Sequence, residues 1–149
     1  MYIPRNKKIK KNVVIQRSNI SAQEISTTVA DINGTELSYT PTSGASKIVY
    51  EFKIQYHNDP DTHNNFFYEI RKDSGSGYSA LGQGYRVNHT YQNVAGQNIF
   101  EGRFVLDTWS GSNDLKMTIR SWDGSRRVTL HEDEAGNHFD PIIKVYSLM

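Results

Sequence analysis

The stretch Ser46–Tyr56, SKIVYEFKIQY, decides the fold class because apolar and polar side chains alternate along it. Five apolar or aromatic side chains share one face, namely Ile48, Tyr50, Phe52, Ile54 and Tyr56. The other face carries lysine, glutamate and glutamine, with Val49 as the exception. A period of two places one face of a strand on a core and the other in water. These residues therefore predict a core β-strand with one solvated face.

The rest of the chain repeats this pattern in further runs, at residues 65–71, 97–108, 115–120, 128–130 and 141–148. Clusters of Gly, Asn, Asp and Ser separate the runs, and Asp123-Gly124 is the strongest hairpin signal among them. Residues 20–30 hold β-branched side chains that favour a strand over a short helix. This spacing predicts an all-β fold, an antiparallel β-sandwich of the jelly-roll kind.

Length and composition narrow the class of protein. A chain of 149 residues suits one domain. The sequence has no cysteine, which excludes disulfides and thiolate metal sites. Nine tyrosines and six phenylalanines suit β structure with much polar surface. No signal peptide and no apolar run long enough to span a membrane is visible, so we expect synthesis in a cytosol and no membrane partner.

The N-terminal segment is strongly basic. Residues 1–17 contain no acidic group and six basic ones, Arg5, Lys7, Lys8, Lys10, Lys11 and Arg17. The remaining residues, 18–149, carry 11 basic and 16 acidic groups. The sequence thus predicts a basic anchoring arm at 1–17 and a mildly acidic sandwich at 18–149.

Two structures remain open for this arm. It is either a disordered tail or, at Val13–Ile15, a short strand that pairs with another segment or chain. We favour docking of the arm into an acidic groove on a partner protein, or onto a neighbouring subunit, over binding of the arm to nucleic acid. Only Tyr2 is available near the basic residues for stacking on bases.

Two polar segments are candidates for chemistry. His57–His63 holds two histidines and two aspartates, which are apt metal ligands, but its spacing matches no metal motif and a polar loop is favoured. His131–Glu134 lacks the second histidine of a zincin signature. Ser79 lacks a nucleophile elbow, and Gly82-Gln-Gly84 lacks the third glycine of a dinucleotide loop. We therefore expect no catalytic residue, metal or cofactor, and a protein that is not an enzyme.

Four aromatic residues near turns are candidate glycan contacts, namely Trp109, Trp122, Tyr78 and Tyr85. Exposed aromatic rings beside loops can stack on sugars. The alternative is that the two tryptophans cap the core or fill a subunit interface, which the sequence favours.

Residues 33–52, NGTELSYTPTSGASKIVYEF, carry a resemblance to a known group of proteins. The stretch resembles the pattern G-T-x-L-x-Y-T-P-x-S-G-A-S-K-V-x-Y-x-F of virion proteins of tailed phages, especially marine ones. The resemblance implies a β-rich, often trimeric domain on the outside of particles, as a fibre tip or a capsid decoration. Together with weaker matches at Ser121–Ser125 and Ile142–Val145, the resemblance covers about half of the chain, and it carries over no catalytic residue.

These observations together predict a virion structural protein assembled in the host cytoplasm. It would be a capsid decoration or short fibre subunit, trimeric, with its arm anchored to the major capsid or tail protein. The alternative is a carbohydrate-binding or receptor-binding adhesion module at a tail-fibre tip, which would contact a host-surface glycan. An enzyme such as a glycan depolymerase is the remaining, least favoured interpretation.

Overall fold

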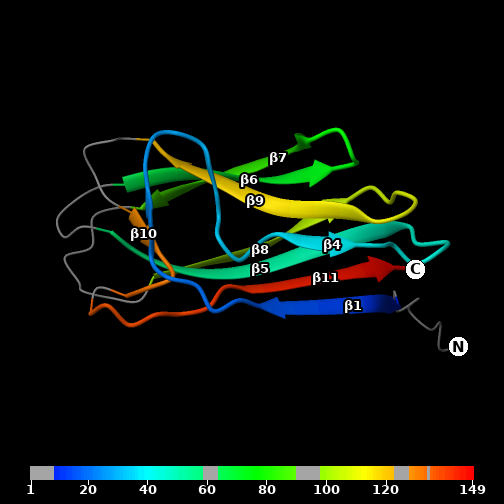
Figure 1. Cartoon of the computed structure of the whole chain (residues 1–149), viewed down its shortest axis with the longest axis horizontal. Helices are drawn as coiled ribbons and strands as arrows, with labels where there is room; N and C mark the ends of the chain where they lie inside the picture. The colour runs from blue at the N-terminus through cyan, green and yellow to red at the C-terminus, as the bar shows by residue number, and fades with distance from the viewer. Residues whose placement is uncertain (1–8, 59–63, 90–97, 123–127, 134) are drawn as a thin grey trace, which may run out of the picture.

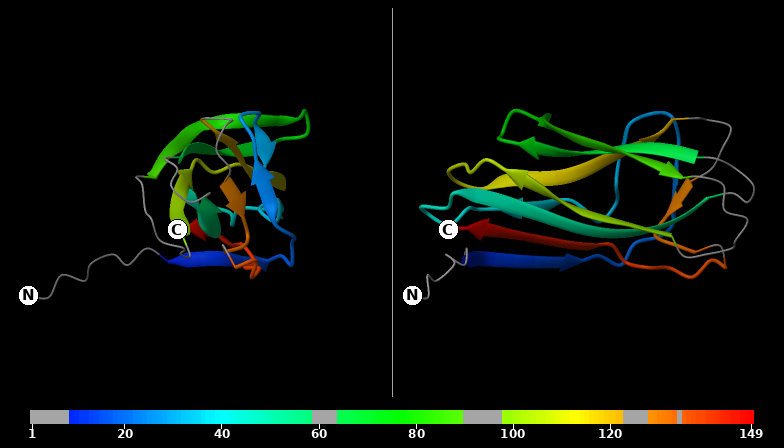
Figure 2. Two further views of the ribbon diagram at one scale, coloured as in Figure 1. Left: turned by 90° about the vertical axis from the view of Figure 1, so that its left-hand side faces the viewer. Right: turned by 180° about the vertical axis from the view of Figure 1, so that it is seen from behind.

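The computed structural model describes residues 9–58, 64–89, 98–122, 128–133 and 135–149. Within these ranges the chain forms eleven strands in two antiparallel sheets that stack on each other (Figures 1 and 2). The strands are β1 Lys10–Arg17, β2 Gln23–Ile25, β3 Ala30–Asp31, β4 Leu37–Tyr39, β5 Lys47–Asn58, β6 Asn64–Asp73, β7 Tyr78–His89, β8 Asn98–Leu106, β9 Asn113–Ser121, β10 Val128–Leu130 and β11 Ile142–Leu148. The predicted antiparallel β-sandwich is confirmed.

Strand β5 is the centre of the larger sheet, which we call sheet A. Its first part pairs with β11 on one side and β8 on the other, so that Tyr50 lies between Val145 and Phe104. Its last residues pair with β10, which in turn pairs with β2. The order β1-β11-β5-β10-β2, with β8 beside β5, makes the predicted strand at 46–56 the one on which the sheet is built.

Strand β9 is the centre of the second sheet, sheet B. It pairs with β6 on one side and with the short strands β3 and β4 on the other, while β6 also pairs with β7. In the part of the chain that the structure describes there is no helix, and hence none long and apolar enough to cross a membrane.

Aromatic rings from both sheets fill the core. Phe66 and Tyr68 of β6 approach Phe100 of β8, with ring centroids 5.1 and 5.2 Å apart. Phe52 of β5 stacks on Phe104 of β8 at 5.5 Å. Phe66 and Phe104 are fully buried. The alternation predicted for residues 46–56 holds, because Ile48, Tyr50, Phe52, Ile54 and Tyr56 all lie in this core.

Residues 33–52 contribute a buried hydrogen-bonded cluster inside the sandwich. Thr35 is fully buried; its hydroxyl donates to the carbonyl of Ile32 at 2.7 Å and accepts the Met117 N–H at 3.1 Å. The hydroxyl of buried Tyr50 donates to the carbonyl of Thr35 at 2.7 Å. Buried polar groups need such partners. Through Thr35 the stretch thus links Tyr50 on β5 of sheet A to Met117 in the second sheet.

The second half of the basic arm belongs to the sandwich. Residues 10–17 form the edge strand β1, which pairs antiparallel with β11 of the same chain. The Gln16 side chain donates to the carbonyls of Gly34 and Glu36 at 3.0 and 2.9 Å, and Asn12 donates to Thr40 at 2.6 Å. The sandwich thus begins before residue 18, because alternate side chains of this segment fit the edge of sheet A. Arg5, Lys7 and Lys8 lie outside the described residues.

Two local predictions were wrong or incomplete. The strands on either side of Asp123-Gly124 do not form a hairpin, because β9 lies in sheet B and β10 in sheet A; the turn itself lies outside the described residues. Strand β7 was not predicted, because Gly82 and Gly84 interrupt its pattern and glycine is rare in strands. It pairs with β6 across the turn at residues 73–77, where the Asp73 carboxylate accepts the Gly75 and Gly77 N–H groups at 2.7 and 2.9 Å.

Candidate functional site

The outer face of sheet A carries charges of alternating sign. On β5 and β8, Lys53 pairs with Glu101, and Glu51 pairs with Arg103 in the neighbouring row. Lys144 of β11 stands beside Glu51 on the other side. Opposite charges directly across a strand pair stabilise a sheet modestly. Because Lys53, Glu101 and Arg103 are exposed, the same charges are open to a partner.

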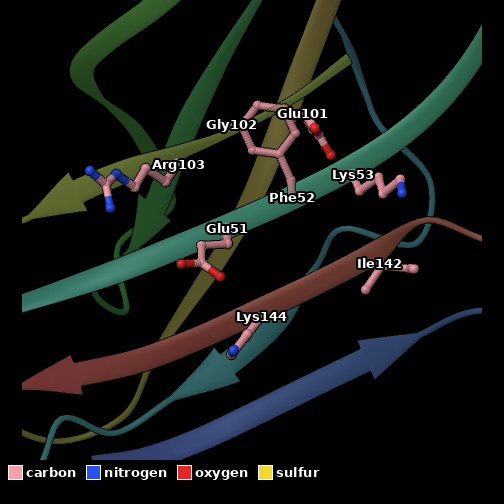
Figure 3. A pocket seen from close by; sticks show the side chains of 8 residues that line it. All are labelled: Glu51, Phe52, Lys53, Glu101, Gly102, Arg103, Ile142 and Lys144. Atoms are coloured by element: carbon pink, nitrogen blue, oxygen red, sulfur yellow. The ribbon is translucent and has the colours of Figure 1, made fainter. Parts of the chain in front are cut away.

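A shallow depression of about 480 Å³ opens in the middle of this face (Figure 3). It is lined by Glu51, Phe52, Lys53, Glu101, Gly102, Arg103, Ile142 and Lys144. A Cβ on Gly102 would come within 3.2 Å of the Phe52 ring in the register-paired position, so the glycine leaves room for the ring. Figure 3 shows the charged side chains around the depression, from β5, β8 and β11.

Aliphatic side chains surround the charges of sheet A. Ile99 and Val105 on β8 expose 47% and 43% of their surface, and Val13 and Ile15 on β1 expose 46% and 59%. Exposed aliphatic residues gathered on one face mark an interaction site more often than scattered ones do. The face thus combines apolar area with charges that fix orientation, as protein interfaces do.

The Tyr146 side chain points away from the core, on the outer face of sheet A, yet neighbouring side chains bury it. Its hydroxyl donates to Glu51 at 2.6 Å, and the Lys10 ammonium lies 4.3 Å from its ring centroid. Burial and the Glu51 carboxylate raise the pKa of Tyr146 to about 12. Of the predicted anchoring residues, Lys10 is thus placed against the ring of Tyr146, whereas Lys11 and Arg17 are exposed on β1.

The outer face of sheet B carries an aromatic group around Arg120. The Arg120 guanidinium lies 5.8 Å from the Phe67 ring and 5.6 Å from the ring of Trp122. Trp122 exposes 59% of its surface. The Phe67 ring covers the backbone of Gly84, where an added Cβ would meet it at 2.3 Å. Sequence reasoning missed Phe67 and Arg120, whose proximity depends on the pairing of β6 with β9.

The four predicted glycan contacts do not form one platform. Trp109 is half-buried against the core, donates to the Tyr39 carbonyl at 3.3 Å, and lines a depression of about 220 Å³. It stands near the start of β9, since Tyr39 pairs with Asn113, while Trp122 follows the end of β9. Nine residues of strand separate the two ends by about 30 Å. For Trp109, the interpretation as a core cap is the better one.

The two tyrosines are also placed apart. Tyr78 donates to Glu36 at 2.9 Å, and the Lys116 ammonium lies 3.8 Å from its ring centroid; burial and the Glu36 carboxylate raise its pKa. Tyr85 is half-exposed and packs on Tyr68 and Phe104, with centroids 5.9 and 5.7 Å away. Tyr85 thus closes the side of the sandwich between β7 and β8.

The two predicted polar segments meet at one end of the sandwich. His57 Nε2 lies 3.4 Å from Glu132 Oε1, and His138 Nδ1 lies 3.9 Å from Glu132 Oε2. No group of three or more such side chains within the described ranges is arranged to hold a metal ion. Residues 59–63 of the first segment lie outside those ranges.

His131 is the most unusual titratable group at this end. Its side chain is fully buried, neither ring nitrogen has a hydrogen-bond partner among the described residues, and its φ is +67°. Burial lowers its pKa from 6.5 to about 4, against a smaller opposing effect of Asp140. The imidazole is therefore neutral in the folded protein at neutral pH.

Comparison with known proteins identifies no family. No family model and no curated protein matches the chain. A solved structure of Eiger TNF from S. frugiperda is similar over 87% of this chain and 92% of that chain, with 10% identity and a TM-score of 0.42. At that TM-score the likeness says nothing about the function of this chain.

Proposed function

We propose that the chain is a structural subunit of a virion surface, a capsid decoration or short fibre protein that acts by adhesion to other proteins. The outer face of sheet A carries the adhesive part of this proposal, since exposed aliphatic side chains there surround opposite charges on a rigid sheet. The location on a virion rests on the resemblance of residues 33–52. Because the described residues of that stretch build the core, the resemblance supports a shared fold and location, not a shared binding site.

Immunoelectron microscopy of purified virus particles tests the proposed location on the virion surface. Antibodies raised against the purified protein should label the particle surface, and peptides of the chain should recur in mass spectra of purified particles. If the chain occurs in infected cells but never in purified particles, the virion proposal fails.

We expect anchoring to depend on residues 1–8 alone. Deleting them leaves β1 and its pairing with β11 intact, so the melting temperature should not change. Co-sedimentation with isolated particle shells should be lost, because Arg5, Lys7 and Lys8 are removed. Replacing these three residues by glutamine is the matched variant, and it should have the same effect if their charge mediates docking. Full binding by both variants would contradict the anchoring role.

Glycan adhesion is the second candidate function, favoured by the group of Trp122, Arg120 and Phe67. An exposed indole beside a guanidinium offers one apolar face and several hydrogen-bond donors to a sugar ring. The other predicted contacts are engaged elsewhere, since Trp109 packs against the core, Tyr78 contacts Glu36 and Lys116, and Tyr85 packs on Tyr68 and Phe104.

Trp122→Ala should reduce binding on a glycan array about tenfold or more, the scale of a lost aromatic anchor. The melting temperature should stay unchanged, because Trp122 is exposed. Ile9→Ala removes a similarly exposed apolar side chain next to β1 and is the matched control. Equal glycan binding by wild type and Trp122→Ala, or no binding by either, would exclude this site.

A further inference from the structure

The charges of sheet A are arranged symmetrically about one residue pair, Phe52 and Gly102. These two residues face each other in the register of β5 and β8. Lys53 and Glu101 lie in the row on one side of the pair, and Glu51 and Arg103 in the row on the other. The four charges therefore form a square in which every edge joins opposite signs.

Such a square is complementary to itself. Consider a rotation by 180° about an axis that lies in the plane of the sheet, crosses the strands and passes over Gly102. A second copy placed face to face by this rotation brings its Lys53 opposite Glu51 and its Arg103 opposite Glu101. In a two-fold interface each such contact occurs twice. Four pairs of opposite charges thus face each other between the two copies.

The same rotation also brings exposed aliphatic residues of the two copies into contact. Ile99 and Val105 lie three residues to either side of Gly102, and both point outward. The rotation sets Ile99 of one copy against Val105 of the other. On β11 it sets Ile142 against the aliphatic stem of Lys144, which can cover apolar surface.

Other two-fold arrangements fit less well. An axis along β5 would place Glu51 on Glu51 and Lys53 on Lys53, and like charges in contact disfavour association strongly. The signs alone also fit a two-fold axis that runs along the strands midway between β5 and β8, where Lys53 of one copy would face Glu101 of the other and Glu51 would face Arg103. That axis sets Ile99 and Val105 against β5 of the other copy and not against each other, so the aliphatic residues favour the axis over Gly102. A different protein would have to reproduce this pattern, whereas a second copy carries it already.

We propose that two copies of this chain associate through the outer faces of their A sheets, related by a two-fold axis over Gly102. This proposal does not depend on a virion location, and it puts a dimer in place of the trimer expected from the resemblance. A patch that is seven residues long and four strands wide, from β8 through β5 and β11 to β1, covers roughly 450 Å² per copy. Standard interfaces bury about 800 Å² per partner, so we expect a weak, salt-sensitive dimer.

Two charge reversals on β8 test the proposal. Glu101→Lys sets two lysines against Arg103 residues, and Arg103→Glu sets two glutamates against Glu101 residues. In sedimentation velocity, wild-type protein should approach twice the monomer mass as its concentration rises. Each variant alone should dissociate about tenfold or more readily. A 1:1 mixture of the two variants should regain the dimer, because the lysine introduced in one chain then faces the glutamate introduced in the other.

The control is Asp31→Lys, the same reversal at an exposed position on β3 of sheet B, which should dimerise like wild type. Circular dichroism checks that every variant is folded. Recovery in the mixture supports the face-to-face contact, since neither variant associates by itself. A monomeric or trimeric wild type, variants that dimerise like wild type, or a mixture that stays monomeric would each overturn the proposal.

Discussion

Gly34→Ala should lower the free energy of unfolding by about 2–5 kcal/mol, the largest effect we expect from a single added methyl group. Gly34 has a φ of +81°, a conformation that costs an alanine about 1–2 kcal/mol. Its added Cβ would also lie 2.8 Å from Pro141 Cγ, 3.0 Å from Ile20 Cδ1 and 3.1 Å from Ser18 Cβ. The proline ring has little freedom to move aside, so the collision adds to the backbone strain.

Gly111→Ala is the matched control for this substitution. Gly111 has nearly the same φ, +79°, but its Cβ would meet nothing within 4 Å. It should lose only the backbone part, about 1–2 kcal/mol. Urea unfolding followed by tryptophan fluorescence measures both variants. Equal losses at the two positions would show that Gly34 is needed only for its φ, and that the packing around it is tolerant.

The second large effect concerns acid stability and His131. Its pKa is about 4 in the folded chain and 6.5 when unfolded, so the unfolded state binds a proton first as the pH falls. Stability is therefore full above pH 6.5 and declines as the pH falls toward 4. The lowered pKa corresponds to a total loss of about 3 kcal/mol.

His131→Asn should flatten this decline, because asparagine does not titrate and tolerates the positive φ of this position. A comparison at one pH alone does not suffice; the slope of unfolding free energy between pH 6.5 and 4 is the readout. His138→Asn, at an exposed position, is the control and should leave the wild-type slope largely in place. A wild-type slope that persists in His131→Asn would contradict the role of His131.

The fold class was predictable because it depends on local periodicity. The alternation over residues 46–56 requires one buried face in any sheet, and the turn residues between the runs indicate a series of separate strands. Strand β7 was not predicted because a glycine adds neither an apolar nor a polar side chain to the alternating pattern of a strand. The reason for a glycine at position 84 is visible only in the structure, where the Phe67 ring covers its backbone.

The arm illustrates the same limit. A run of lysines indicates a solvated segment, yet Asn12, Gln16 and the alternate side chains of residues 10–17 fit the edge of sheet A. Whether an amphipathic run becomes a tail or an edge strand depends on whether a partner edge is free. β11 supplies that edge at the other end of the chain.

The sequence by itself determined the all-β class, the core face of β5, the absence of cysteine chemistry and the basic character of the N-terminal segment. Only the tertiary structure decided which charges stand together. Glu51 and Arg103 are 52 positions apart in the chain, and their pairing depends on the register of β5 with β8. Register is set by packing across the whole sheet, and a shift of one residue reverses the face of every side chain. Local sequence therefore specifies strands, while surfaces made from several strands emerge only when the core has fixed their alignment.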